Sequence, residues 1–475
     1  MSDPLLVLAL AAGSGGGRID GIDAGALVAA GLTLLQRSAP LVRALTGRRA
    51  AILLPTSPAF LTALAASEGR GAVLVNPLAA PPEIAYQVGD ANVGAVFTVA
   101  SLADRLPASV PTVLLDDAPR AARVLVDGTP RDVDLGTHFG LSLAGRGDGS
   151  GRDEEAAIVY TSAMAGTPLG AVLSHRSLLA NARSSVEALA ITGADHFLAV
   201  LPYTHLFGLT VSGIAPLLAG ARVTTMGRFN PSRALDALRG DVSAVVAVPA
   251  VFNSLLTLIG RGGGTLRPGA LRLAISGGAV LPRLVQERWF DATGVELRQG
   301  YGLTEAGPVC LFNHVDRPNV RGTLGSPFPN VDVSVRDRHT AAPLGVGAEG
   351  EICVRGDNLF SGYVGNSGAG LEIRDGWLHT GDLGVANADG TVSFVGLGKP
   401  MFTRSGFNVY PRELERVVGA LPGVREVTVR AVPDAAREHH IAIDVRGSVT
   451  VAEVTRWCKT RLSAYKQPGV VTVTG

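Results

Sequence analysis

Short apolar runs alternate with helical segments through the first part of the chain, and this alternation limits the fold more than any other feature. The run 50–54 is stopped by Pro55 and predicts a buried strand, and 72–75 predicts a second strand. Leucine and alanine at helical spacing predict helices at 24–45 and 58–66. Strands that alternate with helices are typical of parallel sheets with crossover helices, so the sequence predicts an α/β fold.

The same pattern divides the chain into expected domains. Alternation resumes after residue 156, whereas short strands between glycine, proline and aspartate turns follow residue 322. A compact tail begins near residue 398, with helices expected at 411–421 and 451–464. We expect a large N-terminal domain (1–397) with two α/β subdomains (about 1–155 and 156–321) and a β-barrel-like subdomain (322–397), followed by a small mobile α+β C-terminal domain (398–475).

Charge and cysteine content exclude several classes of protein. The 475 residues carry 42 Lys plus Arg and 41 Asp plus Glu, a net charge of +1, which gives no electrostatic basis for binding nucleic acid or an anionic membrane surface. Cys310, Cys353 and Cys458 are widely separated, so we expect neither a disulfide framework nor a zinc site, and a cytoplasmic location fits. No apolar run approaches the ~20 residues of a membrane span.

Four glycine-rich polar patches lie between the apolar runs and are the candidate ligand loops. Small and hydroxyl residues after a strand can turn backbone amides toward a phosphate. Taken alone, the first patch is explained equally well as a tight turn between two strands. The patches are YTSAMAGTPLG at 160–170, QGYGLTEAG at 299–307, GWLHTGDLG at 376–384 and GFNVYPRELE at 406–415.

In this order and spacing, the patches resemble the adenylate-forming superfamily, and the pattern is most similar to that of acyl-CoA synthetases and ligases. The resemblance covers nearly the whole chain. The segment 301–305 matches the family's Y-G-x-T-E element in full, and 380–382 matches T-G-D. Further matches are Asn76-Pro77, PYTHLFGL at 202–209, SGGA at 276–279, Gly350-Glu351 and Gly362-Tyr363.

The resemblance implies a reaction in two steps. The carboxylate of a small-molecule acid attacks the α-phosphorus of ATP to give acyl-AMP and pyrophosphate, and the acyl group then passes to the thiol of CoA or of an acyl carrier protein's phosphopantetheine. The first step needs Mg²⁺ and cations against the phosphate charge. Thr304, Glu305 and His205 are the implied catalytic residues, with Thr304 on the α-phosphate, Glu305 on Mg²⁺ and His205 near the acyl carboxylate. Asp382 is implied to accept hydrogen bonds from the ribose hydroxyls.

The remaining candidate residues fall into three groups. The implied nucleotide-binding residues are Thr161, Ser162, Gly166, Gly277, Gly278, Ala279, Tyr301, Gly302 and Asp382. The expected acid pocket is apolar and suits an acyl or aryl group, with Phe207, Val251, Phe252, Gly300 and Val309 as its residues. The thiol side is expected at Gly406 and Asn408, and the hinge between the domains at Lys399 and Pro400.

The sequence departs from the family pattern where the nucleotide phosphates are expected to bind. Met164, Ala165 and Leu169 replace two hydroxyl residues and a lysine of the phosphate loop, and Leu397 replaces an arginine before the hinge. No lysine follows Lys466 in the sequence, so the family's C-terminal catalytic lysine is not matched. Losing one such group typically costs ~10²–10³ in rate. We therefore expect ATP-dependent adenylation to be severely impaired.

The hinge carries a second departure. Lys399 matches the family pattern, but Pro400 follows it. Because a residue before proline is held in extended backbone, we expect Pro400 to restrict the large dihedral changes by which such C-terminal domains turn.

Three functions stay open at this stage. The chain is an acid–thiol ligase that still uses ATP, or a homologue that acts on a pre-activated acyl group, or a non-catalytic partner in a biosynthetic pathway. Pyrophosphate exchange separates the first function from the other two. Incubation with synthetic acyl-AMP and CoA separates the second from the third.

Overall fold

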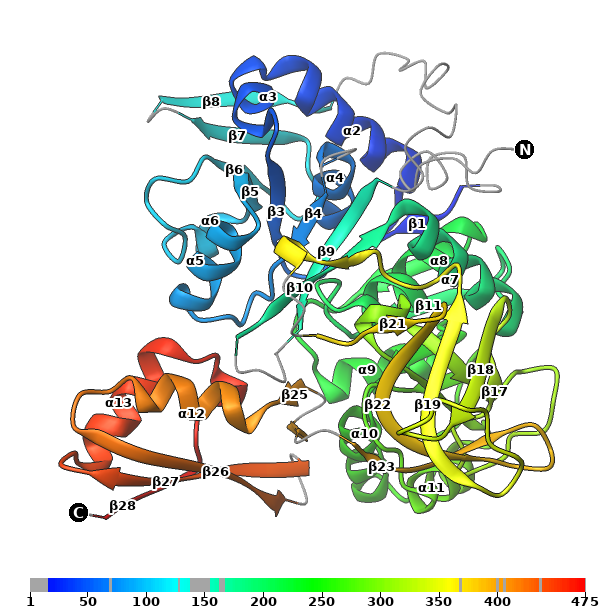
Figure 1. The fold of residues 1–475 in the computed structure, drawn as a ribbon. Helices are drawn as coiled ribbons and strands as arrows, with labels where there is room; N and C mark the ends of the chain where they lie inside the picture. Colours follow the sequence, from blue (N-terminus) through cyan, green and yellow to red (C-terminus); the bar gives the residue numbers. More distant parts are fainter. Residues whose placement is uncertain are drawn as a thin grey trace.

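The computed structural model describes residues 16–67, 71–126, 129–136, 154–161, 167–366, 370–398, 401–404, 407–434 and 438–474. Two nine-stranded sheets form the body of the larger domain, and the smaller domain lies beside α5 (Pro81–Asp90; Figure 1). The first sheet is parallel at its centre and antiparallel at both edges. Its strands, in spatial order, are β20 (Gly362–Tyr363), β10 (Leu169–Ser174), β9 (Glu155–Thr161), β4 (Ala72–Leu74), β3 (Arg49–Leu53), β5 (Val93–Thr98), β6 (Thr112–Leu115), β7 (Ala121–Val126) and β8 (Thr129–Asp134).

The second sheet carries the strands that deliver most of the candidate site. Its central strands are parallel, and β13 at the centre is fully apolar, as expected for a strand covered on both faces. Their carboxyl ends therefore meet at one edge, where ligands bind in open α/β sheets. The order is β17 (Ser326–Pro327), β16 (Val309–Phe312), β15 (Leu297–Gly302), β14 (Leu273–Ser276), β13 (Ala244–Ala247), β11 (His196–Ala199), β12 (Arg222–Thr225), β1 (Arg18–Ile19) and β2 (Ile22–Asp23).

Helices cover both sheets and bury a large apolar core, with a second, smaller apolar cluster against the first sheet. The contact between α2 and α4 is close because Gly31 has no side chain there: a Cβ would lie 2.3 Å from the carbonyl oxygen of Thr62. The helices of the larger domain are α2 (Ala24–Arg37), α3 (Ala39–Leu45), α4 (Pro58–Ala66), α5, α6 (Ala100–Ala103), α7 (His175–Ala188), the π-helix η1 (Phe207–Ile214), α8 (Ala215–Leu218), α9 (Pro231–Arg239), α10 (Pro249–Arg261) and α11 (Arg283–Thr293), with the 3₁₀ turns η2 (Thr304–Ala306) and η3 (Val364–Asn366).

A third, antiparallel sheet follows in the larger domain, and the smaller domain then forms around its own apolar core. The third sheet contains β18 (Val331–Arg336), β19 (Glu349–Gly356), β21 (Ile373–Arg374), β22 (Trp377–Ala386) and β23 (Val392–Leu397). The smaller domain contains β24 (Phe402–Arg404), β25 (Phe407–Val409), α12 (Pro411–Gly419), β26 (Val424–Asp434), β27 (Glu438–Gly447), α13 (Val451–Arg461), the turn η4 (Ala464–Lys466) and β28 (Val470–Thr474).

The elements differ from the sequence expectations at two places. The segment 24–45 forms two helices that break at Ser38, because Pro40 has no N–H to continue the first helix. The two α/β sheets do not part near residue 155. Strands β9 and β10 complete the first sheet, while β1 and β2 add to the second sheet. Pairing between strands distant in sequence decides this division, and a local pattern does not encode it.

Among the described residues, no single helix has both the length and the apolar composition needed to cross a membrane. The pair α2 and α3 meets both criteria together, but its axis bends by 93° at the break.

Candidate active site

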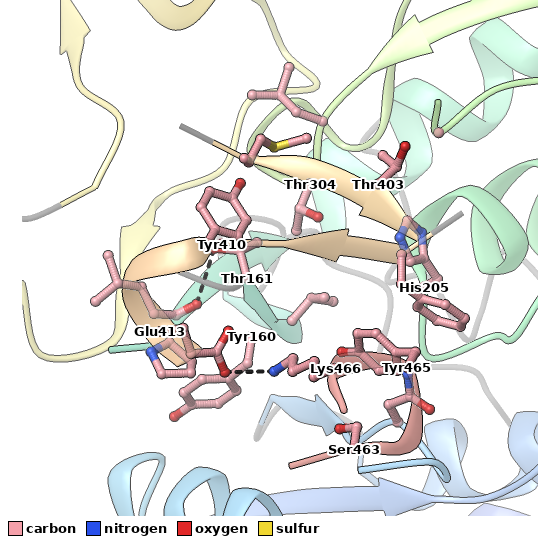
Figure 2. Close-up of a pocket in the computed structure, with 18 of the residues that line it drawn as sticks. Tyr160, Thr161, His205, Thr304, Thr403, Tyr410, Glu413, Ser463, Tyr465 and Lys466 are labelled. Carbon is pink, nitrogen blue, oxygen red and sulfur yellow. Dashed lines mark hydrogen bonds and ion pairs between the residues drawn. The ribbon is translucent and has the colours of Figure 1, made fainter. Parts of the chain in front are cut away.

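The loops after the strands meet in a cavity of about 970 Å³ between the two domains (Figure 2). The larger domain contributes the turn after β15, the end of β9 and the loop after β11. The smaller domain contributes β24, β25, α12, the end of α13 and the segment after it. We call these the N-terminal wall and the C-terminal wall of the cavity. Four sequence patches that lie far apart in the chain thus converge on one space.

Tyr301 and Asp382 form the first fixed pair in the N-terminal wall. The Tyr301 hydroxyl donates a hydrogen bond of 2.8 Å to Oδ2 of Asp382. Burial and the neighbouring Asp382 charge raise the pKa of Tyr301 well above its ordinary value, so it remains a donor. Gly302 lets the backbone of residue 308 approach closely here, because a Cβ at that position would lie 1.7 Å from the carbonyl oxygen of Pro308. The hydrogen bond from Tyr301 fixes the Asp382 carboxylate. Asp382 can therefore accept hydrogen bonds from a ligand hydroxyl in a defined orientation.

Glu305 is the second buried carboxylate of the N-terminal wall and is 6% exposed. It lies in the turn η2, and its Oε1 accepts hydrogen bonds from Tyr363 at 2.8 Å and from Thr161 at 3.4 Å. Burial, followed by the Glu305 charge, raises the pKa of Tyr363, so this hydroxyl also remains a donor. Three elements distant in sequence therefore fix one carboxylate at the cavity surface.

A hydrogen-bonded trio behind the wall fixes the strand that carries Asp382. His379 Nδ1 lies 2.9 Å from Oε2 of Glu351 and 3.5 Å from Sγ of Cys353. The other Glu351 oxygen accepts the backbone N–H of Gly381 at 2.8 Å. Burial, followed by the Glu351 charge, raises the pKa of Cys353 to about 12, so the thiol stays protonated. The trio joins β19 to β22 and holds the T-G-D segment.

His205 begins the helical segment after β11 and lines the cavity. The His205 side chain is exposed to the cavity space, and desolvation by the surrounding protein lowers the pKa of the imidazole. A neutral imidazole can donate one hydrogen bond to a carboxylate or a carbonyl oxygen without adding charge.

Aromatic and cationic side chains form the C-terminal wall. Tyr410, Phe407, Arg416 and Arg461 line the cavity from this side. Burial, followed by the charges of Glu305 and Asp382 across the cavity, raises the pKa of Tyr410. The electrostatic influence of those two carboxylates thus reaches from one wall to the other.

Two leucines lie in the N-terminal wall where the family pattern has cations. Leu397 pairs directly with Asp382 in the register of β22 and β23, and Leu169 pairs with Thr161 in the register of β9 and β10. Both leucines line the cavity. Among the described lining residues, every lysine and arginine belongs to the C-terminal wall.

Most of the catalytic and nucleotide residues expected from the sequence line this one cavity. They are Thr304, Glu305, His205, Thr161, Gly278, Ala279, Tyr301, Gly302 and Asp382. Gly277 lies just behind the surface, where a Cβ would come within 2.9 Å of the Phe207 ring. Ser162 and Gly166 lie outside the described residues.

The expected acid pocket is not open. Of its five residues only Gly300 lines the cavity; Phe207, Val251, Phe252 and Val309 do not. Phe252 is fully buried and packs edge-on against Trp289 at a centroid distance of 4.9 Å. These side chains fill the space between sheet and helices, which a sequence pattern cannot distinguish from a ligand pocket.

The thiol side and the hinge are only partly described. Asn408 lies in β25, opposite Thr403, on the C-terminal side of the cavity. Gly406, Lys399 and Pro400 lie outside the described residues, so their roles stay predictions.

Sequence reasoning missed three contributors. Tyr363 is visible in the G-Y element, but its bond to Glu305 depends on the pairing of β20 with β10. Glu83 and Lys466 line the cavity from opposite domains and form an ion pair. A single charged residue on each of two distant segments gives no sequence signal for such a contact.

The donor set of the N-terminal wall suits a hard divalent cation. Glu305, Thr304 and Thr161 bring carboxylate and hydroxyl oxygens to the cavity surface, and Mg²⁺ prefers oxygen ligands. A Mg²⁺ ion at Glu305 fits these residues.

Comparisons with known proteins agree with this geometry. Residues 41–364 match the family model of the AMP-binding enzyme. A long-chain-fatty-acid–CoA ligase of Escherichia coli O157:H7 is 30% identical over 462 residues, which cover 90% of this chain and 82% of the ligase.

Two solved structures extend the likeness to both domains. A malonyl-CoA ligase in a ternary product complex with methylmalonyl-CoA and AMP is 27% identical, with a TM-score of 0.78 over 97% of this chain and 95% of that one. ATP-bound MatB from Rhodopseudomonas palustris is 28% identical, with a TM-score of 0.65 over 100% of this chain and 93% of that one. The Y-G-x-T-E and T-G-D segments build the cavity, and the family match covers most of the sequence. The chain therefore belongs to the AMP-binding enzyme family and is an enzyme of the acid–thiol ligase type.

Proposed function

We propose that this protein forms acyl thioesters chiefly by transferring an acyl group from an acyl-adenylate to a thiol, and that it activates free acids with ATP only weakly. One observation carries the proposal. Leu397 lies beside Asp382 at the point where the family pattern has an arginine. The ribose side of the site therefore keeps its carboxylate and lacks the neighbouring cation.

The charge of the cavity wall supports the same proposal. The described lining carries the carboxylates Glu83, Glu305, Asp382 and Glu413 against the cations Arg416, Arg461 and Lys466. Transfer of a nucleotidyl group needs cations and dipoles preorganised around developing phosphate charge. An excess of carboxylates suits AMP, with its single phosphate, better than the triphosphate of ATP.

The comparison of the two solved structures gives independent support. At nearly equal identity, this chain overlays better on the product complex with methylmalonyl-CoA and AMP than on ATP-bound MatB, with TM-scores of 0.78 and 0.65. The arrangement of both domains is thus more similar to that of the product complex than to that of MatB, whose apo and ATP-bound structures overlay equally on this chain, with TM-scores of 0.66 and 0.65.

Each wall residue has a role in this proposal. Asp382 accepts the ribose hydroxyls and Tyr301 keeps its carboxylate oriented. Glu305 holds Mg²⁺, which supplies charge neutralisation at the phosphate when it is bound. Neutral His205 donates a hydrogen bond to the acyl oxygen, and Thr304 contacts the phosphate. Tyr410 and Phe407 close the cavity over the reacting carbonyl and exclude water.

Two assays on the purified protein test the proposal. Acid-dependent exchange of labelled pyrophosphate into ATP measures adenylation, and synthetic acyl-AMP plus CoA measures thiol transfer. We expect transfer to proceed at least about 100-fold faster than exchange, because one missing electrostatic group typically costs ~10²–10³. Exchange as fast as transfer contradicts the proposal, and the absence of both reactions favours a non-catalytic partner.

The identity of the thiol follows from the same transfer assay. CoA and a phosphopantetheine-loaded acyl carrier protein are compared at equal concentration, with fatty and aromatic acyl-AMPs as donors. The apolar lining favours an apolar acyl or aryl group.

A further inference from the structure

A buried ion triad joins the two domains at the edge of the cavity. Lys466 lies in η4 of the smaller domain, and its side chain is 7% exposed. Its Nζ is 2.6 Å from Oε1 of Glu413 in α12 and 2.9 Å from Oε1 of Glu83 in α5. Figure 2 shows Lys466, Ser463 and Tyr465 on the C-terminal side of the pocket beside Glu413. The pair with Glu413 lies within one domain, whereas the pair with Glu83 crosses between domains.

Glu83 is held firmly on the N-terminal side of this contact. Its Oε2 accepts the backbone N–H of Ala80 at 2.6 Å, which fixes the carboxylate at the start of α5. The same oxygen accepts the hydroxyl of Ser463 from the smaller domain. Glu83 thus presents both oxygens to the smaller domain, and α13 packs against α5 beside it (Figure 1).

The triad allows the two domains to separate and to rejoin, because only one of its two ion pairs crosses between them. Burial opposes the charge on Lys466, but Tyr465, Glu413 and Glu83 outweigh this effect and raise its pKa, so the amine stays charged. Removing the only partner of a buried charge is very costly. Because Glu413 travels with Lys466, separation of the domains breaks the pair with Glu83 and still leaves the lysine with a carboxylate.

The contact also reaches the wall that covers the cavity. Tyr465, next to Lys466, stacks on Phe407 with ring centroids 4.5 Å apart and an interplanar angle of 21°. Arg404 of β24 donates to the carbonyl oxygens of Tyr465 and Gln467. The position of η4 against Glu83 therefore sets the position of Phe407 over the cavity.

From these contacts we propose that Glu83 is a positioning residue for thiol transfer. It pairs with Lys466 and Ser463 and thereby holds the smaller domain in the product-like arrangement over the acyl-adenylate. This inference rests on the proposed function, because it assumes that the domain arrangement held by Glu83 serves thiol transfer. The contact itself stands on the geometry of α5, α12 and η4.

Distance measurement tests the contact without any catalytic assay. Spin labels at Asp236→Cys and Lys459→Cys, one in each domain, report the inter-domain distance by pulsed electron resonance. The native cysteines Cys310, Cys353 and Cys458 are buried and label poorly. We expect one narrow distance population in the parent protein and a second population of comparable size in Glu83→Gln. An unchanged, single population in Glu83→Gln overturns the inference.

Rate measurement tests whether the contact positions the smaller domain for transfer. We expect Glu83→Gln to lower the rate of transfer from acyl-AMP to CoA about tenfold and to leave pyrophosphate exchange undiminished. A merely structural effect lowers both rates equally, and that result would overturn the positioning role. Ser463→Ala, which removes one hydroxyl and no charge, should shift both readouts in the same direction by a smaller amount.

A matched control and the parent protein separate the two proposals. Asp104→Asn removes an exposed carboxylate after α6, outside the cavity lining, and should leave distances and rates unchanged. If the parent lacks transfer activity, the proposed function fails, and the spin-label distances still decide whether Glu83 holds the domains together.

Discussion

The two walls of the cavity are built on opposite principles. The N-terminal wall carries two buried carboxylates, Glu305 and Asp382, each fixed by a tyrosine hydroxyl, and leucines where the family pattern has cations. The C-terminal wall carries the lysine and arginines of the described lining, and Lys466 is already matched by two carboxylates. The carboxylates are thus fixed within the larger domain, whereas the cations of the lining belong to the smaller domain.

In the proposed function, this difference between the walls accounts for a family member that keeps one half-reaction and largely lacks the other. Thiol transfer uses an adenylate that is already made, and it needs orientation and exclusion of water more than it needs cations. Adenylation needs cations around a triphosphate. Four variants test how far this contrast between the walls extends.

The largest expected effect is the loss of the fixed carboxylate in Glu305→Gln. The amide keeps the size of the side chain but cannot supply the negative oxygen for Mg²⁺, so we expect adenylation and any Mg²⁺-dependent transfer to fall about 10²–10³-fold. Initial rates across a Mg²⁺ titration measure this loss. Glu349→Gln, at an exposed position at the start of β19, is the matched control. A decrease of less than threefold contradicts the assigned role.

The second variant, Leu397→Arg, places a cation in the N-terminal wall. An arginine opposite Asp382 in the β22–β23 register can reach both the carboxylate and a bound phosphate. We expect pyrophosphate exchange to rise about tenfold, with transfer from acyl-AMP changed by less than twofold. Val395→Arg adds the same charge two residues away, outside the cavity lining, and should not raise exchange. Equal gains in both arginine variants refute a local effect.

A smaller effect is expected from Tyr301→Phe, which removes the hydrogen bond to Asp382 and keeps the ring. We expect AMP to bind about fivefold more weakly, as for a hydrogen bond worth ~1 kcal/mol. Calorimetric titration with AMP measures the affinity. Tyr86→Phe removes a different hydroxyl in the cavity, the one bonded to the carbonyl of Pro168, and should have less effect. Equal losses in both variants argue against a specific Asp382 contact.

The smallest effect concerns the stability of the folded larger domain, and it appears at acidic pH. Burial lowers the pKa of His175, at the start of α7, to about 4, against ~6.5 for an unperturbed histidine. The unfolded chain therefore binds the proton first, so stability is complete above about pH 6.5 and is lost as pH falls toward 4. The loss amounts to at most roughly 3 kcal/mol.

His175→Gln tests this assignment. Urea unfolding at pH 7, 5.5 and 4.5 should show a flatter pH dependence in the variant than in the parent protein. Parallel pH profiles for the two proteins would mean that another group titrates.

Local pattern was enough for much of the fold and for one wall of the site. The helix expected at 411–421 matches α12, and the helix expected at 451–464 matches α13 within a few residues. Thr304, Glu305, Tyr301 and Asp382 were expected together because the Y-G-x-T-E and T-G-D segments resemble motifs of the adenylate-forming family, and all four residues line the cavity. Backbone turns and side-chain chemistry are local properties, and sequence records them.

What the tertiary structure alone decided depends on contacts between segments far apart in the chain. Phe252 has the composition of an acyl pocket residue, yet it packs on Trp289 in the core. Glu83 and Lys466 are separated by 383 positions, and only the docking of α13 on α5 brings them within 2.9 Å. The sequence by itself determined the family, the carboxylates of the site and the leucines that replace its cations. Folding determined which apolar side chains, such as Phe252, stay buried in the core, and which charged residues, Glu83 and Lys466, join the two domains. Both depend on packing between segments that are distant in the sequence.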